Sequence, residues 1–451
     1  MKNLIFASLL IFSQTIQLNA ASEDDSVVVQ LETEGRLLPT YLAPIKPGAF
    51  DLAYTGKLET VLRFDLSNNG TMKVTRNSPD LDAISNEKEI AKPANLPTWR
   101  AAEMYYVVNA TIDSARKLSA KVIAVNGATM KRVDNIPLTG DLNRDRQQIH
   151  KVADAIHKAL FGTEGIASKR LLYTSKTVHT KDHEISEVYE SDYDGANVRQ
   201  LTHEKALCVS PFYLPPAPGR KPGTFFYVSY APGIPKIFAA PLANGDGQRI
   251  ITLRGNQLLP TISKQRDQLA FISDASGNPD LFLAPFDPEE GQTEKPRQIY
   301  SIPHATQGSP TFSPDGTKVA FVSNKDGRAR IYVMDIPEPG AKIRSIKPEM
   351  ITKANRECTA PQWSPDGKKL VYQSRIEKHR QILTYDFFTG EEKQLTTGPT
   401  DKENPAWAPN SMHIAYNSRG QIYMINTTNP VPVQVTTGPG EKHFPAWEPG
   451  S

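Results

Sequence analysis

The second half of the chain contains a repeat, and its period restricts the fold more than any other feature. The repeat is clearest at Pro310–Gly316 and Pro361–Gly367, which read Pro-Thr-Phe-Ser-Pro-Asp-Gly and Pro-Gln-Trp-Ser-Pro-Asp-Gly. Related copies begin at Pro211, Pro260, Pro405 and Pro445. Successive copies are therefore 49, 50, 51, 44 and 40 residues apart. This period is typical of four-stranded propeller blades, whereas common helical repeats are about 33 residues long.

Each copy carries the same order of strand and turn signals. A strand with an aromatic residue leads to an Asp-Gly turn, which supplies the positive φ of a tight hairpin. The alternating strand 318–323, a second turn at 324–327 and the strand 330–335 follow in the copy that starts at Pro310. We expect the prolines to precede or interrupt strand ends, where a missing N–H is least harmful. The aromatic position, expected to pack between neighbouring blades, is occupied by Phe312, Trp363, Trp407 and Trp447.

The number of blades follows from the last copy, which is incomplete. It starts at Pro445 and the sequence stops at Ser451, after little more than one strand. Residues 169–202 contain the strands that this copy lacks. The sequence thus predicts a six-bladed β-propeller over 169–451, closed by the C-terminal strand, because closure removes exposed sheet edges.

The region before the repeat has a different composition and predicts an N-terminal α/β domain over 37–165. Of 36 prolines, 7 lie in residues 1–168 and 29 in residues 169–451. His150 and His157 lie seven apart on the last helix and are interpreted as packing or solvated residues, since no metal-ligand spacing is present. The expected strands are 37–45, 72–75, 105–112, 118–125 and 129–136, and the expected helices are 51–67, 97–103 and 143–161.

The first 36 residues read as a targeting signal and a short acidic segment. A lysine at position 2 and an apolar run at 4–12 precede small residues around Ala20 and Ala21, which predicts a signal peptide over 1–21. The segment 22–36 is either a flexible tail or a strand that adds to a partner's sheet. Its candidate partner-binding residues are Val27, Val28, Val29 and Leu31.

Charge and cysteine content exclude several classes of protein. The formal net charge of +3 is too small to indicate a nucleic-acid partner, and no later apolar stretch is long enough to span a membrane. The two cysteines, Cys208 and Cys358, each lie three residues before a repeat proline. They occupy equivalent positions three blades apart, so two free thiols are expected. No catalytic residue, metal site or cofactor is predicted.

The pattern resembles the TolB family of the Tol–Pal envelope system over nearly the whole chain. The resemblance rests on the order of parts, on Ser-Pro-Asp-Gly at 313–316 and 364–367, on Ser191–Gly195 (Ser-Asp-Tyr-Asp-Gly) and on Phe444–Trp447. The second and third blades depart from it, because the Ser-Pro-Asp-Gly turn is missing from both. The resemblance implies a monomeric periplasmic adaptor that supports outer-membrane integrity and cell division. It also implies two partners: the peptidoglycan-associated lipoprotein Pal at the propeller mouth, and a TolA-like inner-membrane-anchored protein at the N-terminal segment.

Position matching around the ring gives the candidate mouth, since propeller loops form concave openings and often carry function. These loops connect consecutive blades and contain mostly polar or charged residues. The candidate residues are His203, Glu204, Asn256, Gln257, His304, Gln307, Gly308, Ser309, Arg356, Glu357, Lys402, Glu403, Asn404, Lys442 and His443.

The alternative is a propeller-based periplasmic hydrolase or lyase. The sequence lacks Gly-x-Ser-x-Gly and His-Glu-x-x-His, and the pairs His183-Glu184 and His203-Glu204 have no second histidine at that spacing. A purely structural envelope protein without specific partners is a third possibility.

Overall fold

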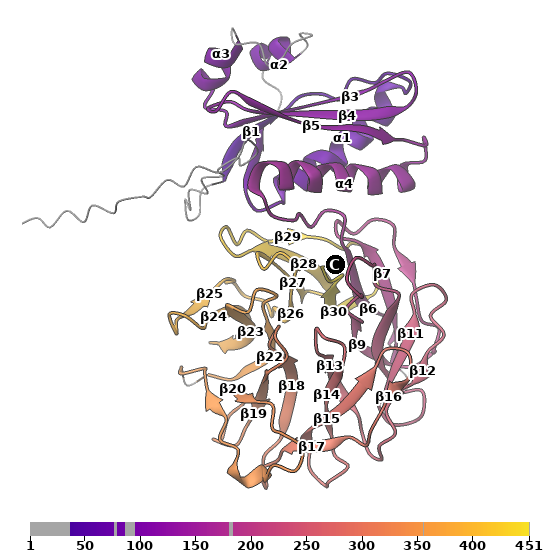
Figure 1. Ribbon diagram of the computed structural model, residues 1–451, viewed down its shortest axis with the longest axis vertical. Helices are drawn as coiled ribbons and strands as arrows, with labels where there is room; N and C mark the ends of the chain where they lie inside the picture. Colours follow the sequence, from indigo (N-terminus) through magenta and orange to yellow (C-terminus); the bar gives the residue numbers. More distant parts are fainter. Residues whose placement is uncertain (1–36, 76–78, 86–94, 180–183, 355, 451) are drawn as a thin grey trace, which may run out of the picture. The chain divides into compact units, whose positions relative to one another are not determined.

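The computed structural model describes residues 37–75, 79–85, 95–179, 184–354 and 356–450 (Figure 1). The predicted signal peptide and the segment 22–36, with Val27, Val28, Val29 and Leu31, lie outside the described residues. None of the helices within the described ranges combines the length and apolarity needed to cross a bilayer.

The α/β region is built on a five-stranded sheet with the order β2-β1-β3-β4-β5. The strand β1 runs parallel to β2 and β3, whereas β4 is antiparallel to β3 and β5. The prediction of an α/β region is confirmed, but the helix α2 was not predicted. The strands are β1 (Leu38–Leu42), β2 (Met72–Thr75), β3 (Tyr106–Ile112), β4 (Lys117–Ala124) and β5 (Thr129–Pro137), and the helices are α1 (Leu52–Ser67), α2 (Pro79–Ser85), α3 (Leu96–Ala101) and α4 (Leu142–Phe161).

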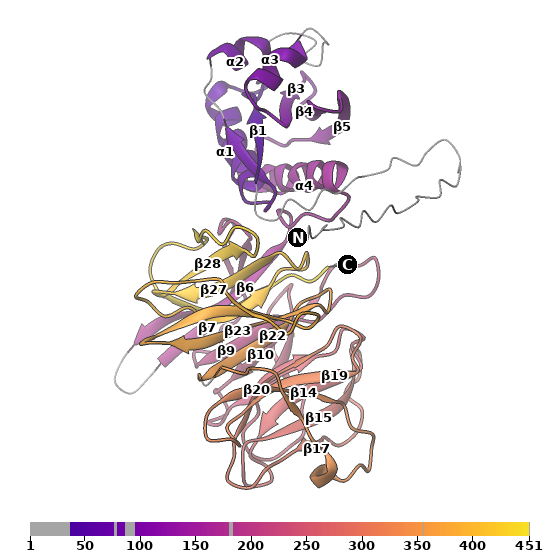
Figure 2. The same cartoon turned by 90° about the vertical axis from the view of Figure 1, so that its left-hand side faces the viewer.

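Helices lie on both faces of this sheet (Figures 1 and 2). Alternating side chains of its strands pack against them. Leu42 and Val108 point into the core formed with α1 and α4, whereas Tyr41 and Val107 contact the cluster around Trp99 of α3. The start of α4 is fixed by Asp141, whose carboxylate accepts the N–H of Asn143 at 2.9 Å. The helix ends at Gly162 in the left-handed conformation, with φ of 71°.

The repeat region forms six sheets, which are the six predicted blades. The first blade contains β30 (Glu441–Trp447), β6 (Arg170–His179), β7 (Glu184–Asp192) and β8 (Arg199–Gln200). The second and third contain β9 (Cys208–Tyr213), β10 (Thr224–Ser229), β11 (Lys236–Pro241), β12 (Gln248–Arg249), β13 (Leu258–Ile262), β14 (Gln268–Ser273), β15 (Asp280–Asp287), β16 (Gly291–Gln292) and β17 (Arg297–Tyr300). The fourth, with the 3₁₀ turn η2 (Ile343–Ser345), contains β18 (Gln307–Phe312), β19 (Lys318–Ser323), β20 (Arg330–Asp335) and β21 (Glu349–Met350). The last two contain β22 (Cys358–Trp363), β23 (Lys369–Ile376), β24 (His379–Asp386), β25 (Glu392–Gln394), β26 (Glu403–Trp407), β27 (His413–Ser418), β28 (Gln421–Asn426) and β29 (Val433–Gln434).

The C-terminal strand closes the ring, as the sequence predicts. β30 pairs antiparallel with β6, and Trp447 lies opposite Leu171 in this register. The backbone N–H of Arg170 donates to the Glu448 carboxylate at 3.0 Å, and Lys169 donates to the carbonyl of Pro449 at 3.1 Å. The first and last parts of the propeller are therefore joined by a backbone ladder and by side-chain contacts.

The first strands of the six blades share a β-bulge directly before the repeat proline. Each strand pair shows a register shift at this point. The prolines therefore lie inside the first strands and not at their ends, and the bulge removes the ladder position that would need their N–H. The residue before each proline has a positive φ of 42° to 53°, and these residues are Ser210, Leu259, Ser309, Ala360, Asn404 and Phe444.

The repeated aromatic residues pack between neighbouring blades, which confirms their predicted role. Trp407 lies in a cluster with Val371 and Ile382 of the preceding blade and Ile414 of its own blade. Its indole N–H donates to the carbonyl of Gln362 at 3.2 Å. Each blade therefore depends on its neighbour for part of its core.

The two cysteines occupy equivalent positions at the start of β9 and β22. Cys208 lies opposite Ser229, and Cys358 lies opposite Ser374. Both are buried free thiols, and burial raises the pKa of both thiol groups. The predicted placement three blades apart is consistent with this arrangement.

Candidate functional site

A cavity of about 810 Å³ opens between the fourth and fifth blades, where loops between blades meet β-hairpin turns. The loops before β18 and β22 and the turns that follow β19 and β23 line it. Ser309, at its wall, is one of the bulged residues with positive φ. The structure thus brings together five of the fifteen predicted mouth residues: Gln307, Gly308, Ser309, Arg356 and Glu357.

The lining of this cavity is polar and carries an excess of positive charge. Its charged lining residues are three arginines and two glutamates: Arg328, Arg356, Arg375, Glu357 and Glu377. Arg328 and Arg375 are exposed, whereas Arg356 is half-buried. The guanidinium of Arg356 lies 3.4 Å from the Glu392 carboxylate, which partly neutralises its charge. Arg328 belongs to a hairpin turn and Arg375 lies near the end of β23, so matching of the blade-connecting loops alone did not select them.

Two predicted mouth residues outside the cavity lining are exposed. His203 follows the short strand β8, and its ring Nδ1 lies 3.0 Å from the side-chain nitrogen of Gln200. His304 lies in the loop before β18 and has a positive φ of 63°. Both side chains are accessible to a partner.

The other half-buried candidates are held by neighbouring side chains. Glu204 accepts from the Tyr227 hydroxyl at 2.8 Å, and Asn256 donates to Asp274 at 2.7 Å. The remaining contacts join Glu403 to Arg380 at 2.8 Å, Asn404 to Asn417 at 2.8 Å and His443 to Asn417 at 3.3 Å. These residues rigidify the mouth and leave part of their surface open.

Four predicted mouth residues are buried, and the interpretation that their side chains contact a partner needs correction. Lys402 donates to the carbonyls of Thr397 and Thr400, both at 2.8 Å. Three further ring positions, Gln257, Gln307 and Lys442, are likewise buried and donate to loop carbonyls. Charged or amide donors at this ring position satisfy backbone acceptors that a tight loop would otherwise leave unpaired. These four side chains therefore stabilise the backbone of the loops.

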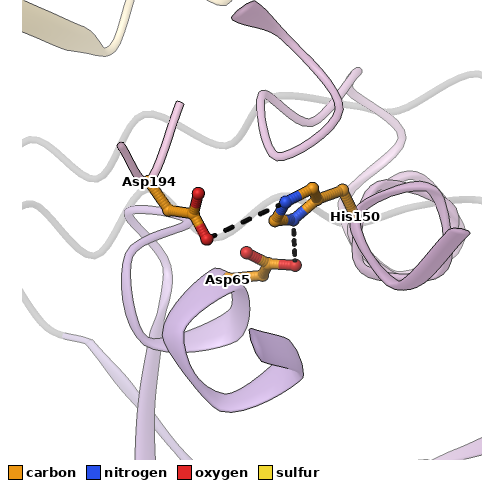
Figure 3. Close-up of side chains that lie close together, drawn as sticks. All are labelled: Asp65, His150 and Asp194. Atoms are coloured by element: carbon orange, nitrogen blue, oxygen red, sulfur yellow. Dashed lines mark hydrogen bonds and ion pairs between the residues drawn. The ribbon is translucent and has the colours of Figure 1, made fainter. Parts of the chain in front are cut away.

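A second group of polar residues lies where the α/β region meets the first blade. His150 of α4 contacts Asp65 of α1, with 2.8 Å between Nδ1 and the carboxylate (Figure 3). The hydroxyl of Tyr193, in the turn after β7, donates to the same carboxylate at 2.8 Å. Asp194, in that turn, lies 3.8 Å from His150 Nε2 and is also bonded by Arg146.

This junction cluster (Asp65, His150, Tyr193 and Asp194) perturbs the titration of its members. Burial raises the pKa of Asp65 to about 6, although His150 and Tyr193 partly oppose the shift. Burial lowers the pKa of His150, but the carboxylates of Asp65 and Asp194 outweigh it, so the net shift is upward. The prediction of a packing or solvated His150 therefore missed a buried ionic contact. Its carboxylate partners are far away in sequence, and no spacing rule would have connected them.

Comparisons with known proteins agree with this architecture. The family model described as the TolB beta propeller domain matches residues 157–451. A TolB homolog of Protochlamydia amoebophila is 50% identical over 386 residues, which cover 85% of this chain and 82% of the relative. A TolB homolog of Chlamydia felis is 43% identical over 270 residues, covering 60% of this chain and 61% of that protein. The crystal structure of TolB from Acinetobacter baumannii shares the fold, with a TM-score of 0.74, 21% identity and coverage of 92% of this chain and 97% of that one. The chain belongs to the TolB family of β-propeller proteins.

Proposed function

We propose that this protein is a periplasmic adaptor of the Tol–Pal system that binds the lipoprotein Pal at its propeller mouth. Membership of the TolB family supports a Tol–Pal component and favours an adaptor over a hydrolase or lyase. The observation that carries the proposed site is the cavity between the fourth and fifth blades. Five of the residues selected from the sequence line it. We place the contact with Pal there.

The cavity walls favour a partner with an acidic surface. Arg328 and Arg375 offer exposed guanidinium groups that can form paired hydrogen bonds with carboxylates. Gly308 and Ser309 present little side-chain bulk, so a partner's backbone can approach the wall closely. The half-buried candidate residues that are hydrogen-bonded to neighbouring side chains are already ordered, which lowers the entropy cost of binding.

The segment 22–36 is proposed to bind a TolA-like protein anchored in the inner membrane. Val27, Val28, Val29 and Leu31 would supply a strand that extends the partner's sheet, and the neighbouring acids would help to orient it. An adaptor with these two contacts would link the envelope layers and support outer-membrane integrity and cell division. In this proposal the chain consists of a signal peptide (1–21), the segment 22–36, an α/β domain (37–165) and the propeller (169–451).

Charge reversal in the cavity tests the Pal site. Arg328→Glu combined with Arg375→Glu is expected to weaken binding of the periplasmic domain of Pal at least tenfold, because repulsion replaces two charge-assisted contacts. Lys368→Glu is the matched control: it is exposed and lies just before β23, whereas Arg375 lies near the opposite end of that strand. Titration calorimetry with each purified full chain provides the dissociation constants.

A deletion variant, compared with the charge-reversed chain, separates the two proposed partners. Deletion of residues 22–35 should abolish retention of the TolA-like protein and leave Pal affinity within twofold. The charge-reversed chain should show the opposite pattern. Equal Pal affinity for the double variant and the Lys368→Glu control would contradict the proposed cavity site.

A further inference from the structure

One ring nitrogen in the junction cluster is buried without a hydrogen-bond partner. His150 is 1% exposed, and its Nδ1 is occupied by Asp65. Within the described part of the chain, its Nε2 forms no hydrogen bond. This atom lies 3.8 Å from the carboxylate of Asp194 (Figure 3). It lies 3.9 Å from a second carboxylate of the first blade, that of Asp192. Buried polar atoms are normally satisfied, so this one points to a ligand.

We propose that His150 Nε2, Asp192 and Asp194 form a binding site for a divalent transition metal of the zinc class. Zinc is bound tetrahedrally at about 2.0–2.2 Å from imidazole nitrogen and carboxylate oxygen, so two of its ligands lie roughly 3.3–3.6 Å apart. The two measured separations of 3.8 and 3.9 Å exceed this range by a few tenths of an ångström. They are too long for hydrogen bonds, and a small shift of the side chains would bring them to the spacing that one shared ion requires. Nitrogen with carboxylate oxygen is a donor set suited to zinc and its neighbours.

In such a site the contact between His150 and Asp65 would orient the metal-binding ring. A metal-binding histidine usually donates its other ring N–H to a carboxylate, which fixes the ring orientation and strengthens the ligand. Asp65 accepts this hydrogen bond and is held by the Tyr193 hydroxyl. Donor atoms of Asp65, His150 and Asp194 all lie within 4.8 Å of one another.

The remaining contacts of the two carboxylates limit the affinity. Asp194 accepts from Arg146 and, at 3.2 Å, from the backbone N–H of Ala196. Asp192 accepts from Asn197 at 2.6 Å and lies 3.4 Å from Arg170. The positive charge of Arg146 acts directly on a proposed ligand, so its removal should strengthen metal binding.

The proposed ion would join α4 to the turn after β7 and so fasten the α/β region to the first blade. This role does not depend on the proposed Pal site. The competing occupant of the space is a proton on His150, which would form an ion pair with the same carboxylates. The two occupants differ in one measurable property, since only the metal site responds to added zinc at constant pH.

The test uses the full chain after treatment with a chelator. Titration with zinc chloride at pH 7.5 should give about one bound ion per chain and raise the melting temperature. His150→Gln and Asp194→Asn should each lose this increase, whereas His157→Gln, which alters the other buried histidine of α4, should keep it. Arg146→Met should bind zinc several-fold more tightly than the unmodified chain.

Two results would overturn the proposal. One is the absence of any zinc-dependent shift in the unmodified chain, which would leave the proton as the occupant. The other is an equal zinc-dependent shift in His150→Gln and the unmodified chain, which would place the ion elsewhere. If His150→Gln does not fold, Asp194→Asn and Arg146→Met decide the question, and unchanged zinc affinity in both contradicts the site.

Discussion

Removal of residues 444–451 is expected to abolish cooperative unfolding of the propeller or to leave it aggregated. This deletion removes most of β30, which supplies the first strand of the blade that contains β6. Leu171 and Leu172 of β6, which lie opposite Trp447 and Ala446, would lose their partners and form an exposed edge. Trp447, which is 6% exposed in the shared core, would leave a large void. Thermal unfolding followed by circular dichroism, together with light scattering, measures the effect.

Two smaller changes calibrate this result. Trp447→Ala keeps the strand and should cost about 3–5 kcal/mol, as is usual for a buried aromatic side chain. Removal of residues 450–451 alone leaves β30 intact and should have little effect. A chain without 444–451 that retains the melting temperature of the full chain would show that β30 does not close the ring.

Acidification from pH 6.5 to 4 is expected to lower stability through two buried histidines near the junction. Burial lowers the pKa of His413 in β27 and of His157 in α4 to about 4. In the unfolded chain these groups titrate near their ordinary value of about 6.5. Between these values the unfolded state binds more protons, so stability falls as the pH falls. A shift of this size corresponds to about 3 kcal/mol for each histidine.

The variant His413→Gln isolates this contribution. The stability difference between His413→Gln and the unmodified chain should change by about 3 kcal/mol in favour of the variant between pH 6.5 and 4. The junction pair acts in the opposite direction, because the pKa values of Asp65 and His150 are raised in the folded state. Both chains contain Asp65 and His150, so the effect of this pair largely cancels when the stability of His413→Gln is compared with that of the unmodified chain. His304→Gln, at an exposed loop position, is the control, and parallel pH profiles for all three chains would refute the prediction.

The blades were predictable because their signals are local and repeated. Residues such as Asp315 and Gly316 specify a turn within a few positions, and the incomplete copy at Pro445 indicates where the missing strand must pair. The helix α4 was predictable because its apolar spacing is regular and Gly162 marks its end. The helix α2 was not predicted, since it spans only seven residues.

The details of the mouth depend on side-chain direction, which periodicity does not give. Ring matching predicted loop positions for Lys402 and Lys442. Lys402 lies directly before β26, whereas Lys442 lies inside β30. Both ammonium groups turn inward to backbone carbonyls, which the matching did not predict. Burial lowers the pKa of both, in agreement with this inward placement. Arg375 lies near the end of β23, a position that matching of the loops between blades did not consider. His150 has partners 85 and 44 positions away, and only folding brings them together.

Hydrogen–deuterium exchange with and without the periplasmic domain of Pal tests the central proposal most directly. Binding at the cavity should slow exchange in the segments 306–309, 324–329, 356–359 and 375–377, which contain most of its lining residues. The turns at 314–317 and 365–368, at the opposite ends of the same blades, should exchange at unchanged rates. Protection confined to those turns, or no protection anywhere at saturating Pal, would contradict an adaptor that holds Pal at the propeller mouth.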